Sequence, residues 1–189
     1  MTAAMSASGS AFASGSTVQI RPAVVEDAAQ IAEVHVRSWQ GAYRGLIPQD
    51  YLDGLDPASW AEGRARSISQ IDWARSACLV AADSASVVGF AHVGPTRDAG
   101  EDRDLTGEVM AIYVTPDAWS TGCGRELMSV ALRRLAEAGY RQATLWVLDA
   151  NARARRFYER AGFEPDGGVQ SDDRGAFQLR EVRYRRALP

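Results

Sequence analysis

The spacing of apolar residues along the chain predicts alternating helical and extended segments. Apolar positions at intervals of three and four residues predict amphipathic helices from Glu26 to about Gly41 and from about Gly122 to Ala138. Gly139 is placed to end the second of these helices. A short helical piece around Tyr51 and a helix from about Pro57 to Ile71 lie between them.

Extended segments fill the spaces between these helices. Short apolar runs bounded by turn residues predict strands at Thr17 to Arg21, Ala77 to Ala82, Val87 to Val93, Leu105 to Val114, Ala143 to Leu148, near Phe163 and Phe177 to Arg185. The acid-rich stretch from Thr96 to Asp104 is interpreted as a solvent-exposed hairpin tip. This order of elements predicts the α/β class, with a mixed sheet flanked by helices and no internal repeat.

The length and the first residues bear on domain organisation. A chain of 189 residues is long enough for one domain with a substantial core and short for two. Residues 1–16 are rich in Ala, Ser and Gly and lack the charged start and apolar centre of a secretory signal. We therefore expect a disordered leader over residues 1–16 and a single domain over residues 17–189.

Composition excludes several classes of partner. Hydrophobic residues make up 46% of the chain, and no apolar run approaches the roughly 20 residues of a membrane helix. A net charge of −3 argues against nucleic acid as the main partner. Cys78 and Cys123 are far apart and suit neither a disulfide framework nor a metal site. We expect a cytoplasmic protein without a membrane segment, a metal or a nucleic-acid partner.

The stretch from Glu108 to Glu126 has the pattern of a strand, a turn and the start of a helix. Gly122 and Gly124 lie at this helix start, where glycine costs about 1 kcal/mol relative to alanine. Glycines allow a bulky anion to approach the unpaired N–H groups and the positive end of the helix, so the stretch predicts a phosphate site. The alternative is that Thr121 caps the helix and the glycines serve only the turn.

A second motif follows the strand that ends at Leu148. Asn151 is placed to cap a helix that runs to Arg160 and ends at Gly162, and Tyr158 lies two turns after Asn151 on the same face. With these residues the sequence resembles the GCN5-related N-acetyltransferase (GNAT) family from about Thr17 to Arg186. Its acetyl-CoA motif matches at Gly122 and Gly124, and its Asn…FYxxxGF motif matches at Asn151, Phe157, Tyr158, Gly162 and Phe163. Trp119 departs from the first motif, because it stands where the family has Gln or Arg.

The resemblance implies the GNAT fold, a mostly antiparallel sheet whose strands at Glu108 to Val114 and Thr144 to Leu148 splay apart. Acetyl-CoA is the implied cosubstrate, with its pyrophosphate on the loop amides and its pantetheine arm between the splayed strands. A main-chain amide near Ile112 would polarise the acetyl carbonyl. The implied cofactor-binding residues are Ile112, Tyr113, Val114, Thr121, Gly122, Cys123, Gly124, Arg125, Asn151 and Tyr158.

The implied reaction is direct attack of a primary amine on acetyl-CoA within a ternary complex. An alkylammonium group with a pKa of about 10 must lose a proton before it attacks. Glu108 is the candidate base, acting through a water and sharing a strand face with Met110 and Ile112, and the alternative is an exposed glutamate at a strand end. Tyr158 is the candidate acid for the departing thiolate, and the alternative is an aromatic ring that fills the seam between helix and sheet.

Candidate acceptor residues come from the first helix and from one central strand. Trp39 and Tyr43, with Tyr51 and nearby aspartates, suit a cationic amine through cation–π attraction, although core packing is an alternative. His92 is expected to face the cleft, with a histidine bonded within the sheet as the alternative. Cys123 at a helix start also allows a less favoured covalent route.

Other functions share the same motifs. A noncatalytic acyl-CoA sensor or interaction module would keep the phosphate loop, and a transferase of longer acyl groups would keep every motif named above. The presence of both Glu108 and Tyr158 favours the enzyme. The expected partner is a small-molecule or peptide amine, and a homodimer is compatible with the sequence.

Overall fold

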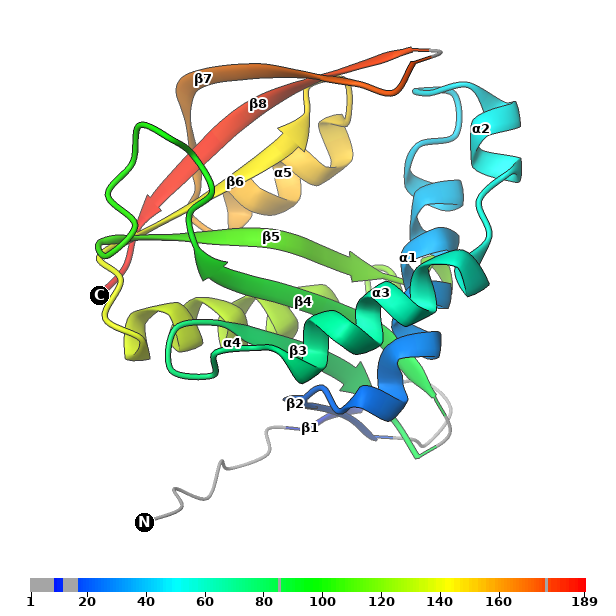
Figure 1. Ribbon diagram of the computed structural model, residues 1–189, viewed down its shortest axis with the longest axis horizontal. Helices are drawn as coiled ribbons and strands as arrows, with labels where there is room; N and C mark the ends of the chain where they lie inside the picture. Colours follow the sequence, from blue (N-terminus) through cyan, green and yellow to red (C-terminus); the bar gives the residue numbers. More distant parts are fainter. Residues whose placement is uncertain (1–8, 12–16, 85, 176) are drawn as a thin grey trace.

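The computed structural model describes residues 9–11, 17–84, 86–175 and 177–189 (Figure 1). The first half contains strands β1 (Gly9–Ala11), β2 (Thr17–Pro22), β3 (Ala77–Ala82) and β4 (Val87–Pro95), with the short helix η1 (Val25–Asp27) and helices α1 (Ala28–Ala42), α2 (Gln49–Asp53) and α3 (Pro57–Ser69). The second half contains β5 (Thr106–Val114), η2 (Pro116–Ala118), α4 (Cys123–Glu137), β6 (Gln142–Leu148), α5 (Ala152–Arg160), β7 (Glu164–Asp173) and β8 (Gln178–Ala187).

The strands form one sheet in the order β1-β2-β3-β4-β5-β6-β8-β7. Every neighbouring pair is antiparallel except β5 and β6, which are parallel. The predicted mixed α/β sheet is therefore confirmed. Within the expected leader, Gly9–Ala11 is a strand paired with β2, and the rest of residues 1–16 lies outside the described residues.

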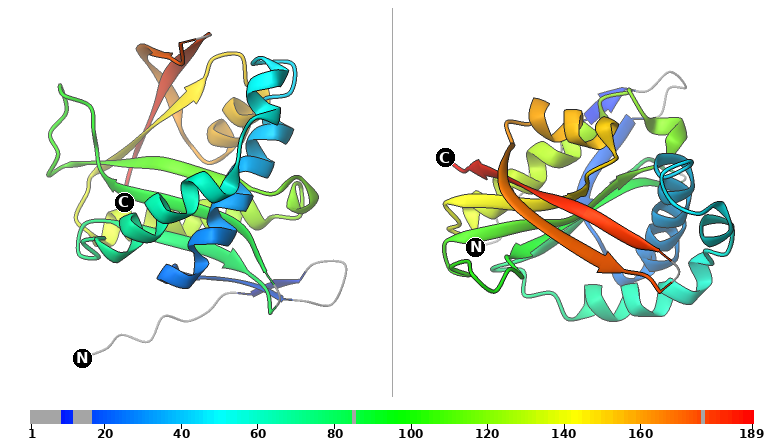
Figure 2. Two further views of the ribbon diagram at one scale, coloured as in Figure 1. Left: turned by 45° about the vertical axis from the view of Figure 1, so that its right-hand side comes forward. Right: turned by 90° about the horizontal axis from the view of Figure 1, so that it is seen from above.

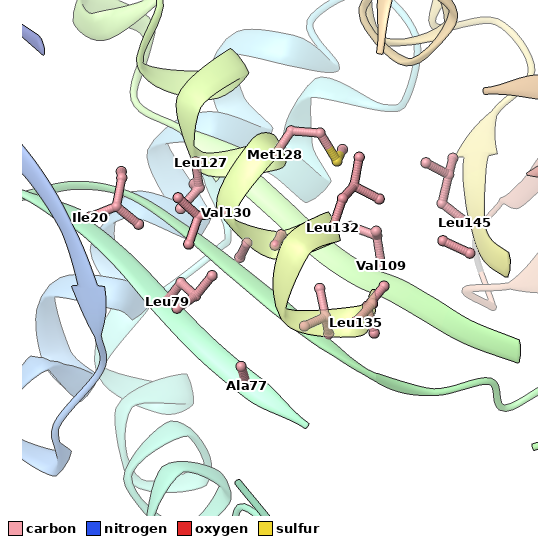
Figure 3. Packing of buried hydrophobic residues seen from close by; sticks show 14 of the residues in the cluster. Ile20, Ala77, Leu79, Val109, Leu127, Met128, Val130, Leu132, Leu135 and Leu145 are labelled. Carbon is pink, nitrogen blue, oxygen red and sulfur yellow. The ribbon is translucent and has the colours of Figure 1, made fainter. Parts of the chain in front are cut away.

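Helices cover both faces of the sheet (Figure 2). Apolar side chains of α4 recur every three or four residues and pack with residues of β2, β3, β5 and β6 in one buried cluster, part of which Figure 3 shows. Helices α1 and α3 cover the opposite face over Val80 and Phe90. A third cluster joins Trp39 and Leu52 to Leu148 and Leu179, near the tip of the β7–β8 hairpin. No helix in the described ranges has both the length and the apolar character needed to cross a bilayer.

Helix ends follow the predicted residues. The side chain of Asn151 accepts a hydrogen bond from the amide of Ala154 at 3.0 Å and so caps α5. Gly139 and Gly162, which follow α4 and α5, have φ angles of 92° and 81°. This left-handed conformation is the usual end of a helix and favours glycine.

The segment between β4 and β5 differs from its prediction as an exposed hairpin tip. Side chains of Asp98 and Glu101 are only 17% and 15% exposed and form ion pairs with arginines of β8. Arg183 lies 3.0 Å from Asp98 and 3.2 Å from Glu101, and Arg185 also bonds Glu101. These ion pairs fix the loop against the end of β8. The arginines that neutralise the two carboxylates lie about 85 positions later in the sequence.

The C-terminal strands are longer than expected. β7 extends over ten residues after Phe163, where the sequence predicted one short strand near Phe163 itself. Its side chains are mostly exposed, so it lacks the apolar alternation that would have revealed its length.

Candidate functional site

A cavity of about 830 Å³ opens where β5 and β6 separate. These parallel strands pair at three positions, from Thr106 with Gln142 to Glu108 with Thr144, and then diverge. From Val109 onward the β6 side of β5 has no strand partner among the described residues. Ile112, Tyr113 and Val114, which the family resemblance assigns to the cofactor, line the cavity along this open edge.

The loop between η2 and α4 forms one end of the cavity. Ser120 and Gly122 have φ angles of 64° and 97°, so the chain turns twice through the left-handed region. In the described part of the chain, no acceptor is assigned to the amides of Ser120, Gly122, Gly124 or Arg125. Unpaired amides on a loop of this shape, at the positive end of a helix, form a concave site for an anion.

Thr121 and Cys123 are not among the described residues that line the cavity. That their backbone amides bind the cofactor stays a prediction. The hydroxyl of Thr121 donates to the carbonyl of Ala118 at 2.8 Å, and its oxygen accepts a long hydrogen bond of 3.4 Å from the amide of Cys123, the first residue of α4. The cap position itself is Gly122, so Thr121 contacts the helix start from one position earlier. Cys123 is 1% exposed, and burial raises the pKa of its thiol to about 11. Cys123 is also not among the described lining residues of the cavity, so its buried thiol is poorly placed for the covalent acetyl-cysteine route considered from the sequence.

Trp119, the residue that departs from the family motif, holds the loop in place. Its indole Nε1 donates to the carbonyl of Val114 at 2.7 Å and so ties the loop to the end of β5. The other edge of the indole lies against α1, where a Cβ added to Gly41 would come within 2.9 Å of it. The guanidinium of Arg153 lies over the indole, 3.6 Å from the ring centre.

Asn151 and Tyr158 line the cavity from the side of α5. Asn151 is 6% exposed, so the capping residue is itself part of the buried wall. Tyr158 is half-buried and packs edge-on against the rings of Phe157 and Phe163. Burial raises the pKa of Tyr158 well above its usual value, and the nearby Tyr113 and Glu181 raise it further. The phenol is therefore protonated at neutral pH and able to donate a proton.

Glu108 lines the cavity but is bound to Arg97. Its carboxylate accepts from the Arg97 amide at 2.8 Å, from Nε at 3.1 and 3.2 Å, and from Nη2 at 2.5 Å. The Glu108 side chain is 1% exposed, whereas that of Arg97 is 62% exposed. Both carboxylate oxygens therefore already accept hydrogen bonds, which leaves Glu108 less available as a base than an exposed glutamate would be.

The predicted strand face of Glu108 is wrong. Val93 pairs with Val109 and His92 pairs with Ala111, so Met110 is an extra residue that forms a β-bulge. Val109 and Ile112 both pack in the cluster under α4, whereas Ala111 packs under α1 and α3. Because neighbouring side chains in a strand alternate, Glu108 lies on the face opposite Val109 and Ile112.

The predicted acceptor residues at the C-terminal end of α1 lie in the cavity wall, whereas the predicted histidine does not. Trp39 and Tyr43 line the cavity, with their ring centres 5.0 Å apart in an edge-to-face arrangement. His92 is not among the described lining residues. It stands between Cys78 and Ala111 in the sheet, both of which pack under α1 and α3, and burial lowers its pKa.

Several residues of the wall escaped sequence reasoning, among them Arg97, Ser120, Arg153 and Glu181. Ser120 lies inside the recognised loop, but its left-handed backbone has no sequence signal because it is not a glycine. Glu181 lies two positions after Leu179 in the last strand and therefore shares the face of that apolar residue. This spacing was the sequence signal that Glu181 points toward the interior of the protein.

Known proteins share this sequence and arrangement. Residues 39–163 match the model of the acetyltransferase (GNAT) family. The N-acetyltransferase YuaI of Bacillus subtilis, itself uncharacterised, is 34% identical over 135 residues, which cover 71% of this chain and 73% of that protein. The N-acetyltransferase Rv2775 of Mycobacterium tuberculosis is 28% identical over 154 residues, covering 80% and 83%.

Solved structures share the fold at lower sequence identity. The acetyltransferase yncA of Salmonella typhimurium, determined with acetyl-CoA, superposes with a TM-score of 0.71 at 19% identity and covers 91% of this chain and 94% of its own. The family model spans about two thirds of the sequence and includes the loop before α4, Asn151 and Tyr158. This chain belongs to the GNAT family of acetyltransferases.

Proposed function

We propose that this acetyltransferase moves the acetyl group of acetyl-CoA to a primary amine of a small molecule or peptide, by direct attack in a ternary complex. One observation carries the proposal: a single cavity joins the anion-binding loop at Gly122 to Tyr158 and Glu108 through the gap between β5 and β6. A phosphate site and a proton donor at two ends of one cleft suit a long phosphorylated thioester.

The charge of the cavity wall supports binding of coenzyme A at the loop. α4 and α5 contribute Arg125, Arg153 and Arg160 to the wall, and no carboxylate from these helices lies among the described lining residues. The amides of the Ser120 to Arg125 loop add hydrogen-bond donors. Guanidinium groups and a helix N-terminus are the usual partners of phosphate, so this end suits the pyrophosphate and ribose phosphate.

The open edge of β5 suits the pantetheine arm. Pantetheine contains two amide groups, and an unpaired strand edge offers N–H and C=O groups that bind amides as a further strand would. Ile112, Tyr113 and Val114 line the cavity at this edge, and an amide among them would stabilise the oxyanion formed on the acetyl carbonyl. Asn151 lines the opposite wall, where it would contact the same arm.

The proton transfers involve the other end of the cavity. The hydroxyl of Tyr158, protonated at neutral pH, would give its proton to the departing thiolate. Glu108 would act through a water, because Arg97 occupies its carboxylate oxygens. An amine bound between these groups would attack the thioester directly, without a covalent enzyme intermediate.

Thiol release tests the proposal. The protein, incubated with acetyl-CoA and a panel of primary amines, should release coenzyme A at a rate that depends on the amine, and mass spectrometry should show the acetylated amine. Comparing acetyl-CoA with longer acyl-CoA esters would test the alternative of longer acyl transfer. Tight binding of acetyl-CoA without release for any amine would refute the proposal and favour an acyl-CoA sensor.

A further inference from the structure

The tip of the β7–β8 hairpin completes the cavity on the side away from the phosphate loop. In Figure 1 this tip lies beside α2, and the rings of Tyr51 and Phe177 meet there at 4.9 Å. Leu179 packs with Trp39 in the third core cluster. Because side chains alternate along a strand, Glu181 projects to the same side as Leu179, and both line the cavity.

The charges at this end of the cavity leave one carboxylate without a cation. Outside α4 and α5 the wall contains three carboxylates and two guanidinium groups. Glu108 pairs with Arg97, and Asp172 pairs with Arg174 at 2.5 Å. Glu181 forms no ion pair with any described residue, and its Oε2 accepts a hydrogen bond from the neutral amide of Gln170 at 2.7 Å. A half-buried carboxylate in this setting attracts a cation from solution.

The carboxylate of Glu181 lines the same cavity as Tyr158 and Glu108. Its charge contributes to the raised pKa values of Tyr43, Tyr113 and Tyr158, after burial as the main cause. Tyr158 is the proposed acid, so the negative charge of Glu181 reaches the place where the thioester would lie. Apolar and aromatic side chains surround the approach to it, namely Trp39, Tyr43, Leu148 and Leu179.

We infer that Glu181, in place of Glu108 with its occupied carboxylate oxygens, binds the ammonium group of the acceptor and accepts its proton. The acceptor is then an alkylammonium whose adjoining carbon skeleton is apolar or aromatic. This inference rests on the proposed acetyl transfer. The skeleton would lie on Trp39, Tyr43 and Leu179, and the nitrogen would lie between Glu181 and Tyr158.

The proton and electron transfers balance in this arrangement. One ammonium proton moves to Glu181, and the freed nitrogen lone pair forms a bond to the acetyl carbon. The carbon–sulfur bond breaks, and the thiolate takes the phenolic proton of Tyr158. The second proton lost by the nitrogen returns to the Tyr158 phenolate, and Glu181 releases its proton to water. An alkylammonium and acetyl-CoA thus give an amide, a thiol and one proton.

Direct binding separates this inference from the proposed activity. The protein saturated with coenzyme A is titrated in a calorimeter with 2-phenylethylamine, a cationic probe, and with 2-phenylethanol, its neutral match. Glu181→Gln should weaken binding of the amine by about tenfold or more and leave the alcohol unchanged, because the charge of the carboxylate is lost. Glu164→Gln, an exposed glutamate of the same hairpin, should change neither affinity.

Turnover as a function of pH tests the proton transfer. With an amine that is acetylated, kcat/KM of Glu181→Gln should fall at neutral pH and recover toward the pKa of the free amine, about 10, where the nucleophile is already neutral. Wild type and Glu181→Gln share the other titratable and charged groups of this part of the cavity wall, so the effects of those groups cancel in the comparison: Tyr43, Tyr113, Tyr158, Arg97, Glu108, Asp172 and Arg174.

The outcomes are distinguishable. Equal binding of 2-phenylethylamine by wild type and Glu181→Gln, absence of amine binding in wild type, or loss caused by Glu108→Gln instead, would overturn the role of Glu181. Failure of every amine to release coenzyme A would refute the proposed function, whereas the calorimetric comparison would still decide whether Glu181 is the cation site.

Discussion

The guanidinium carbon of Arg153 lies 3.6 Å from the centre of the Trp119 indole ring, so the first turn of α5 is held over the loop that precedes α4. No carboxylate among the described residues pairs with Arg153, and burial lowers the pKa of its guanidinium. The indole is itself fixed by its hydrogen bond to Val114. Trp119, in the position where the family pattern has Gln or Arg, thus positions a cation from another helix beside the loop that we propose binds phosphate.

Removing that cation should weaken cofactor binding. Arg153→Ala should raise the Kd for coenzyme A by about tenfold, the usual worth of one charge-assisted hydrogen bond to phosphate. The Kd for pantetheine, which has no phosphate, should not change. Calorimetry measures both, and Arg156→Ala, on an exposed position of α5 outside the cavity wall, is the matched control.

Trp119→Leu should weaken coenzyme A binding through the same arginine. The double variant with Arg153→Ala should then bind about as well as Arg153→Ala alone, because the two residues act as a unit. Additive losses would show that Trp119 contributes to binding independently of Arg153.

Tyr158→Phe should lower kcat by about 10²-fold or more, the usual contribution of a positioned general acid. The phenyl ring keeps its packing against Phe157 and Phe163, so the Kd for coenzyme A should stay within about twofold. Stopped-flow thiol release and calorimetry give the two quantities. A variant that turns over at the wild-type rate would exclude the hydroxyl as the acid.

The features that the sequence predicted well are those that depend on the spacing of neighbouring residues. The helices, most strands and the positions of Gly122, Asn151 and Tyr158 depend on spacing within some 20 residues, which the sequence displays directly. Glu181 and Arg153 reach the cavity through strand order and helix packing, which local spacing does not encode. The bulge at Met110 likewise has no sequence signal, and it reverses the expected face of Ile112.

Cys123 shows two effects in competition. A helix N-terminus lowers the pKa of a thiol, which suggested a reactive residue from the sequence. In the folded chain the side chain packs in the apolar cluster under the sheet, and desolvation outweighs the helix end.

Alanine variants of Gly122 and Gly124 distinguish an effect on coenzyme A binding from an effect on stability. A Cβ on Gly124 would meet Phe157 at 3.5 Å, an ordinary contact, so Gly124→Ala should leave the fold intact and stabilise the helix by up to about 1 kcal/mol. Because Gly124 lines the cavity, the same change should weaken coenzyme A binding. For this one variant, urea unfolding should show an increased free energy of unfolding, and calorimetry should show a weakened affinity for coenzyme A.

Gly122→Ala is the contrasting variant. With φ at 97°, an alanine there is strained and should cost about 1–2 kcal/mol of unfolding free energy, in addition to any loss of binding. Equal stability of the two alanine variants would contradict the different backbone requirements assigned to the two glycines.

Stability at acid pH should depend on His35. Its Nδ1 lies 2.8 Å from a guanidinium nitrogen of Arg64, which only donates, so the ring proton is on Nε2. Tyr113 and Trp60 cover the ring at 4.5 and 4.6 Å. Burial, with the charges of Arg64 and Arg174, lowers the pKa of His35 from 6.5 to about 3.

The sign of the effect follows from proton counting. Between pH 6.5 and about 3 the unfolded His35 binds a proton and the folded one does not, so acidification through this window destabilises the fold. His35→Gln, which keeps an acceptor for Arg64, should reduce the slope of unfolding free energy against pH by up to about 1.4 kcal/mol per unit. Urea unfolding at closely spaced pH values measures it. His92→Gln, which removes the other histidine of lowered pKa, should add a separate reduction, and an unchanged slope in His35→Gln would refute a neutral His35.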